Sequence, residues 1–198
     1  RPHMSEYEIR AGRAGEELQL RPLWRECFGD IEESMVCYET NIFRPEWVEV
    51  AVWEGQVVSM LSMIPSTVHT GGGERLYSGY LYSLATLPEH QDKERWGAEG
   101  MVCFSGIPDV PSLFGYYKRT MKADPAFYVR EAQVEAIPAA APLTPQPASV
   151  SDYCAARNHQ LQGRTHIEWI EQAVQFQRAA CHQEGGDMFL FREAPDCC

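Results

Sequence analysis

Histidine and cysteine are the residue types in this chain best suited to bind a metal or act as a nucleophile, and their spacing decides whether they can. The six histidines show no H-E-x-x-H arrangement or other metal-ligand spacing. The seven cysteines are scattered, and only Cys197 and Cys198 are neighbours, which is not the C-x-x-C geometry of zinc and redox sites. We therefore expect no metal cofactor, and we expect reduced thiols in a cytoplasmic protein.

Two other groups of residues have the right types for chemistry. The glycine run at residues 71–73 precedes a predicted strand and lacks the Lys-Ser/Thr of phosphate-binding loops, so it predicts a hairpin tip. Glu46, Glu49 and Glu54 surround another predicted strand, where a carboxylate could bind or deprotonate an amine, although most such side chains lie in solvent. None of these groups alone names a reaction.

Composition excludes two classes of partner. The 198 residues are 44% hydrophobic and 23% charged, which is typical of a folded globular protein. The formal net charge is -11, and an acidic surface repels nucleic-acid phosphates and anionic lipid heads. No apolar run approaches the roughly 20 residues of a membrane span, and the chain does not open like a signal peptide. We expect neither a nucleic acid nor a membrane as partner.

The elements that must position any site begin with a short strand at residues 7–10 and two helices. The first helix covers residues 16–28 and ends at Gly29, and the second starts after Asp30 and ends before Pro45. Their predicted apolar stripes contain Leu18, Leu20, Leu23, Trp24, Cys27 and Phe28 in the first helix, and Met35, Val36, Tyr38 and Phe43 in the second.

The middle of the chain has the alternation of strands. Residues 47–53 and 56–64 flank the hairpin signal Glu54-Gly55, and a long strand follows at residues 76–87. A strand at residues 101–107, a helix at 112–122 and a strand at 127–137 complete the pattern. The sequence therefore predicts an α/β (α+β) fold with a mixed, largely antiparallel central sheet flanked by helices.

A change of composition suggests a domain boundary. Residues 137–149 contain four prolines among small residues and predict an extended linker. Helices at residues 150–162 and 166–184 and a final strand at 188–191 predict a partial second α/β piece. The expected division is a domain at residues 5–136, a linker at 137–149 and a partial C-terminal half at 150–198.

The order of these elements and two motifs resemble the GNAT superfamily of acyl-CoA-dependent N-acyltransferases. After its long strand that family has L-A-T-x-P-E-x-R/Q, which Leu84, Ala85, Thr86, Pro88, Glu89 and Gln91 match. Residues 113–118, L-F-G-Y-Y-K, match a later family helix that ends in tyrosine and a basic residue. The resemblance covers residues 7–134, and residues 150–198 are similar to a bacterial subgroup in which a second GNAT-like half follows the first.

The resemblance implies a splayed sheet that binds acyl-CoA, in most cases acetyl-CoA, along the backbone of residues 83–87. It implies a direct transfer to the primary amine of a small molecule or peptide, without a metal. Tyr117 is the implied catalytic residue, as the acid that protonates the leaving thiolate. The implied cofactor-binding residues are Leu84, Ala85, Thr86, Gln91, Lys93, Gly97 and Ala98.

The sequence departs from the family where the pyrophosphate should bind. Bulky and charged residues 92–96 follow Gln91 in place of the family's G-x-G/A, and residues 88–99 leave too little chain for the usual turn and helix. Either this helix is lost, or a segment is missing from the sequence at this point. The chain is then an N-acyltransferase, a catalytically degenerate GNAT-like binding module, or one half of a larger acyltransferase that works as a homo-oligomer.

Overall fold

The computed structural model describes residues 7–29, 32–91, 103–107, 111–125 and 144–191, and every structural statement below refers to them. The predicted strand at residues 127–137 and the first part of the predicted linker lie outside these ranges, as do Lys93, Gly97 and Ala98. No helix in the described ranges is long and apolar enough to cross a membrane.

The N-terminal helices lie where the sequence predicts them. Strand β1 (Glu8–Ala11) leads into α1 (Glu17–Phe28), α2 (Glu32–Asn41) and the 3-10 turn η1 (Pro45–Trp47). Helix α1 ends because Gly29 takes a left-handed conformation with φ 64°, and its N–H donates to the Arg25 carbonyl.

The apolar faces of these helices are narrower than the sequence predicts. Leu20, Leu23 and Trp24 of α1 are buried, as are Met35 and Tyr38 of α2. Each helix contacts its neighbours along one side only, so the edges of the predicted stripe reach solvent. The predicted core residues that lie exposed are Leu18, Phe28 and Val36.

A mixed, largely antiparallel sheet forms the centre of the molecule, as predicted. Its strands lie in the order β1-β2-β3-β4-β5, and only the β4–β5 pair is parallel. The Glu54-Gly55 turn joins the two strands of the first hairpin, β2 and β3, with Gly55 at φ 83°. The bounds are β2 (Val48–Trp53), β3 (Gln56–His69), β4 (Arg75–Thr86) and β5 (Cys103–Ser105), followed by α3 (Ser112–Met121).

The predicted helix at residues 166–184 is wrong in its first part. Residues 166–169 form a strand that pairs antiparallel with the outer end of β3, and a helix begins only at Glu171. The pairing partner is distant in sequence, so the local pattern did not reveal it. The C-terminal elements are β6 (Pro145–Pro147), α4 (Val150–Leu161), β7 (His166–Trp169), α5 (Glu171–Gln183) and β8 (Phe189–Phe191).

The prolines of the predicted linker do not prevent a short strand. β6 pairs with β8 in a separate two-stranded sheet, where an edge strand can accommodate prolines that donate no hydrogen bond. Ser149 then caps α4, because its Oγ accepts a hydrogen bond from the Asp152 N–H at 3.0 Å.

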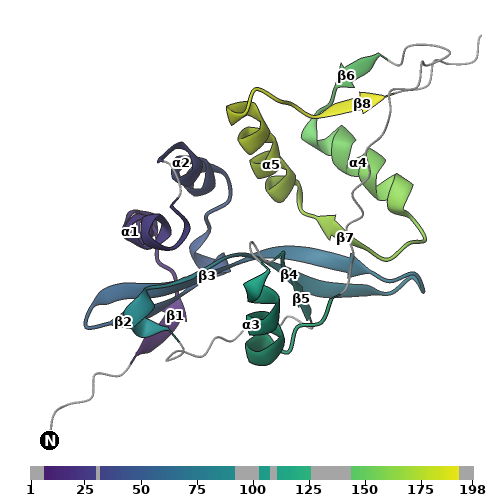
Figure 1. Cartoon of the computed structure of the whole chain (residues 1–198). Helices are drawn as coiled ribbons and strands as arrows, with labels where there is room; N and C mark the ends of the chain where they lie inside the picture. Colours follow the sequence, from purple (N-terminus) through teal and green to yellow (C-terminus); the bar gives the residue numbers. More distant parts are fainter. Residues whose placement is uncertain (1–6, 30–31, 92–102, 108–110, 126–143, 192–198) are drawn as a thin grey trace, which may run out of the picture.

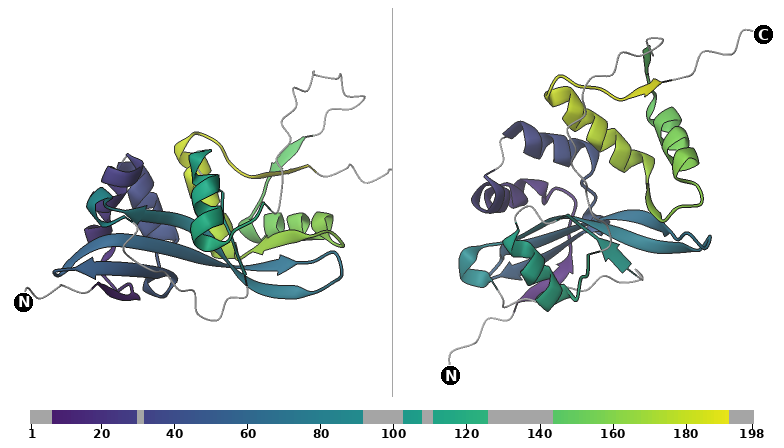
Figure 2. Two further views of the ribbon diagram at one scale, coloured as in Figure 1. Left: turned by 60° about the horizontal axis from the view of Figure 1, so that its bottom comes forward. Right: turned by 45° about the vertical axis from the view of Figure 1, so that its right-hand side comes forward.

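The C-terminal segment shares the core of the N-terminal segment. Figures 1 and 2 show α1, α2 and α5 over the same side of the sheet, and α3 away from them. Phe176 of α5 belongs to the same buried cluster as Trp24, Tyr38 and Met60. Gln172 also donates to the Asn41 carbonyl at 3.1 Å, which ties α5 to α2. The division into two GNAT-like halves remains a prediction.

Candidate active site

Strands β4 and β5 separate after a short paired stretch. Their register joins Ser78 to Cys103 and Tyr80 to Ser105, whereas β4 continues to Thr86. No described strand pairs with that edge of β4 beyond Tyr80. Because an unpaired strand edge presents free N–H and C=O groups, this wedge between β4 and β5 can bind an extended, amide-bearing ligand.

A β-bulge lies at the point of separation. Ser62 pairs with Ser83, and Met63 pairs with Leu81, so Tyr82 is the extra residue of β4. Such a bulge bends its strand and increases the local twist, which turns β4 away from a straight neighbour. Gly106 follows β5 here, and a Cβ on it would lie 3.2 Å from the Leu81 Cβ. The glycine permits the close approach of the two strands at the narrow end of the wedge.

The motif residues Leu84, Ala85 and Thr86 lie on the part of β4 that has no described neighbour on the β5 side. Leu84 and Thr86 are half-buried and Ala85 is buried. The Ala85 carbonyl accepts a hydrogen bond from Ser59 Oγ at 2.9 Å, and the Thr86 carbonyl accepts one from the Cys27 thiol at 3.4 Å. Burial raises the pKa of that thiol, so Cys27 stays protonated and is a poor nucleophile.

The end of β4 is fixed by an aromatic cluster that the sequence did not reveal. The chain leaves β4 through the 3-10 turn η2 (Pro88–His90), and Gln91 follows it, exposed. Tyr7 Oη and His90 Nδ1 are 2.8 Å apart, and the Tyr7 ring lies 4.7 Å from the Trp53 ring. This cluster holds the turn that carries the start of the predicted pyrophosphate loop.

A pocket of about 550 Å³ opens beside the wedge. Tyr80 and Tyr82 of β4 and Ile107, which follows β5, form one wall, while Trp169 and Phe176 come from the C-terminal segment. The Tyr80 and Trp169 rings meet edge to face at 4.8 Å, and the Tyr82 and Phe176 rings do so at 5.3 Å. Aromatic faces of this kind bind apolar groups and cations.

One carboxylate lies in the lining of this pocket. Asp187 Oδ1 accepts hydrogen bonds from Arg178 Nε at 2.8 Å and from the Met188 N–H at 2.7 Å, and His182 Nε2 lies 3.0 Å away. The Arg178 hydrogen bonds, and then those of Met188 and His182, hold the Asp187 pKa well below its usual range. Asp187 is therefore an anion at every physiological pH.

We predict that Arg178→Met raises the pKa of Asp187 toward the ordinary aspartate value of about 3.9. In the wild-type protein the depressed pKa keeps Asp187 ionised, so its contribution to stability is complete above about pH 4 and is lost as the pH falls further. Carboxyl ¹³C chemical shifts followed by NMR from pH 6 to pH 2 should show Asp187 titrating in the variant, whereas the wild-type carboxylate stays mostly ionised over that range. Equal titration midpoints in the two proteins would contradict the assignment to Arg178.

The remaining candidates lie elsewhere. Tyr117 is half-buried on α3, with its ring 5.8 Å from that of Tyr116, and it is not among the residues lining the large pocket. The proposed amine-binding acids Glu46 and Glu54 are exposed, and neither lines that pocket. In the described part of the chain no three histidine, cysteine, aspartate or glutamate side chains are grouped as a metal site.

Comparison with known proteins bears on the family and the fold. Residues 8–98 match the family model described as an acetyltransferase (GNAT) domain. A GCN5-related N-acetyltransferase from Kribbella flavida is similar over 88% of this chain and 50% of its own, with a TM-score of 0.57 and 10% identity. The aminoglycoside N-acetyltransferase AAC(6')-Iy, in complex with CoA, is similar over 69% of this chain and 99% of its own, with a TM-score of 0.53 and 13% identity.

Other structures match only in part. A probable N-acyltransferase from Enterococcus faecalis is 16% identical over 46% of this chain, with a TM-score of 0.39, and this chain spans 23% of its length. A search of curated proteins finds no match. Residues 8–98 therefore match a GNAT acetyltransferase domain, and the mixed sheet with its helices has the fold of these GNAT neighbours.

Proposed function

We propose that this protein is a cytoplasmic N-acyltransferase that uses acetyl-CoA or another acyl-CoA to acylate a primary amine. The observation that carries the proposal is the position of the large pocket. Tyr80, Tyr82 and Ile107, which line it, also flank the point where β4 and β5 separate. A donor held along β4 and an acceptor held in the pocket would therefore meet at one place, which is what a direct transfer requires.

The open edge of β4 fits the acyl-CoA arm. Backbone groups alternate in direction along β4, so those of Ala85 turn to β3, whereas those of Leu84 and Thr86 turn to the open edge, where no described strand occupies them and an amide-bearing ligand could bind. Gln91, Lys93, Gly97 and Ala98 are proposed to lie along the pyrophosphate, as the family motif implies. When bound, acyl-CoA supplies an activated thioester.

The pocket fits an amine with an apolar body. Its aromatic walls attract both hydrocarbon and ammonium groups. The Asp187 carboxylate is ionised but already paired with Arg178, and Arg157 also lines the pocket, so the aromatic rings carry this argument. Tyr117 is proposed as the general acid, whose phenol O–H is the proton source for the leaving thiolate. The amine loses its proton to solvent or to a base during the transfer.

One observation favours a second function. The bulky and charged residues 92–96 replace the glycines that let backbone approach a pyrophosphate, and two of them are acidic. A domain with this loop could bind a small molecule or a protein without catalysing transfer. The chain also spans half the length of the Kribbella flavida protein, so we further propose that it works as one part of a larger or oligomeric acyltransferase.

Isothermal titration with acetyl-CoA, CoA and a longer acyl-CoA tests the proposal. We expect saturable binding of acetyl-CoA at micromolar to millimolar concentration, followed by acylation of at least one cationic aromatic or aliphatic amine in a screen. Absence of binding at millimolar acetyl-CoA would overturn the transferase and leave the binding module.

The role of Tyr117 is tested by a matched pair of variants on one helix. We predict that Tyr117→Phe lowers kcat on the order of 100-fold while leaving the acetyl-CoA Kd unchanged, because only the proton donor is removed. Tyr116→Phe removes the neighbouring hydroxyl and serves as the control, with little change in kcat. A Tyr117→Phe enzyme with the wild-type kcat would exclude this residue as the acid.

A further inference from the structure

Two serine hydroxyl oxygens at the wedge are inaccessible to solvent and have no hydrogen-bond partner in the described structure. The hydroxyls of Ser83 and Ser105 contact no donor or acceptor, and only two other side chains in the described ranges have such an atom, Ser66 and Arg10. Buried hydroxyls in folded proteins nearly always have a partner, because an unpaired polar group loses its hydration without compensation. A pair of unpaired hydroxyls in one place therefore indicates a missing partner.

Other serines of the same strands show the contrast. Ser59 Oγ donates to the Ala85 carbonyl at 2.9 Å, and Ser62 Oγ accepts from Tyr38 Oη at 3.0 Å. A buried serine hydroxyl in this sheet can therefore have a hydrogen-bond partner. The two unpaired hydroxyls differ in where they lie, because both adjoin the place where β4 loses its β5 neighbour.

The register of the strands places both serines at the wedge. Ser105 is the last residue of β5 and lies opposite Tyr80, in the last pair that joins β4 to β5. Ser83 directly follows the bulge residue Tyr82, on the part of β4 that has no described neighbour on that edge. Ser66 differs, because it pairs with Ser78, which has partners on both edges.

We propose that Ser83 and Ser105 are positioning residues that bind the acyl-CoA arm between β4 and β5. This inference rests on the proposed function, since it assigns two side chains to the same donor site. A hydroxyl can donate to a carbonyl and accept from an amide N–H, and the arm carries both groups. We assign Ser105, at the narrow end of the wedge, to the thioester end of the arm, and Ser83, on the part of β4 beyond β5, to one of its amides.

Alanine variants separate a ligand-binding role from a structural role. Removing a hydroxyl that has no partner should leave the melting temperature of the ligand-free protein unchanged or raise it by a few degrees. The same change should weaken acyl-CoA binding about threefold to tenfold, since a hydrogen bond made only with the ligand is lost. A residue that only supports the fold cannot produce these opposite effects.

The experiment measures the melting temperature and the Kd for acetyl-CoA and CoA in Ser83→Ala and Ser105→Ala. We expect Ser83→Ala to weaken both ligands alike, and Ser105→Ala to weaken acetyl-CoA more than CoA, because CoA has no thioester carbonyl. Ser66→Ala is the matched control, because the Ser66 hydroxyl also has no hydrogen-bond partner but lies outside the wedge. It should leave both Kd values unchanged.

The outcomes distinguish this inference from the function on which it rests. Wild-type binding that neither Ser83→Ala nor Ser105→Ala weakens would overturn the inference and leave the proposed transferase intact. An equal loss of affinity in Ser66→Ala would overturn it as well, since the effect would then not depend on the wedge. Failure of the wild-type protein to bind either ligand would overturn both.

Discussion

Replacing Trp24 with alanine is expected to lower the free energy of unfolding by about 3–5 kcal/mol, which is a large part of the stability of an ordinary domain. Trp24 is 4% exposed, and its ring lies 4.7 Å from that of Tyr38 and 6.2 Å from that of Tyr82. Its Nε1–H also lies 2.9 Å from Met60 Sδ. The substitution therefore leaves a cavity where α1, α2 and the sheet meet.

Two control variants make this prediction specific. Trp24→Phe keeps most of the ring volume and should cost clearly less than the alanine variant. Leu18→Ala removes an apolar side chain of the same helix that is 59% exposed, and it should change stability by less than about 0.5 kcal/mol. Urea unfolding at pH 7 measures all three. Equal losses for Trp24→Ala and Leu18→Ala would show that α1 does not pack as described.

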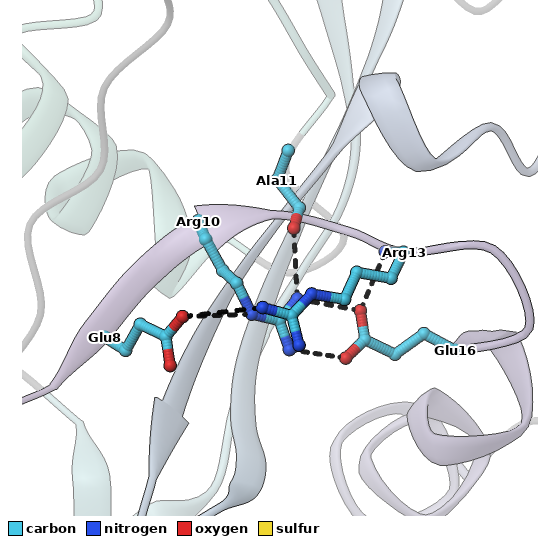
Figure 3. Close-up of polar contacts among 5 residues, drawn as sticks. All are labelled: Glu8, Arg10, Ala11, Arg13 and Glu16. Carbon is cyan, nitrogen blue, oxygen red and sulfur yellow. Dashed lines mark hydrogen bonds and ion pairs between the residues drawn. The ribbon is translucent and has the colours of Figure 1, made fainter.

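Breaking the ion pair between Arg10 and Glu16 should cost about 1–3 kcal/mol, because the half-buried guanidinium loses its strongest partner and keeps only Glu8 and the Ala11 carbonyl. The guanidinium binds the carboxylate through two hydrogen bonds, of 2.6 and 3.0 Å, and the Arg13 N–H donates to the same carboxylate at 2.9 Å (Figure 3). The pair joins the end of β1 to the start of α1, and Glu16 is 6% exposed.

A double variant tests whether the cost comes from the unpaired charge. Glu16→Leu alone leaves the Arg10 guanidinium with only the exposed Glu8 and the Ala11 carbonyl, whereas Arg10→Met with Glu16→Leu removes both charges and should recover part of the lost stability. A double variant as unstable as the sum of its two single variants would contradict this explanation.

The same pair makes stability depend on pH. Hydrogen bonding to Arg10 lowers the Glu16 pKa, although burial opposes the shift, and the Arg13 N–H adds to it. A lowered folded-state pKa means that the contribution is complete above the unfolded value, near 4.3, and is lost as the pH falls. The difference in unfolding free energy between wild type and Glu16→Leu should therefore shrink between pH 6 and pH 3.

The sequence predicted most elements because their signals are local. Gly29 ends α1, the Glu54-Gly55 turn joins β2 to β3, and the alternation of β4 is visible without a structure. The family motif falls on residues 84–86, which lie on the part of β4 that has no described neighbour on the β5 side, and their role in binding the donor stays a prediction. These features depend on backbone preferences and on residues close together in the chain.

Features that depend on distant contacts were not predictable in this way. Residues 166–169 form a strand only because β3 offers a free edge there, and Trp169 and Phe176 line the pocket only because α5 packs beside α2. The unpaired hydroxyls of Ser83 and Ser105 depend on where β4 and β5 part, and serines elsewhere in these strands have partners. No local pattern distinguishes one buried serine from another.

The pairing of β7 with β3 has a consequence for how the chain folds. His69 and Glu168 contact each other across this pair although they lie 99 positions apart in the sequence. Closing so long a loop costs entropy before its contacts compensate, so this strand should join the sheet late and slow the last folding step. During synthesis the nascent sheet then waits with the outer edge of β3 uncovered until the ribosome has released β7, and a chaperone or a second nascent chain can bind there first.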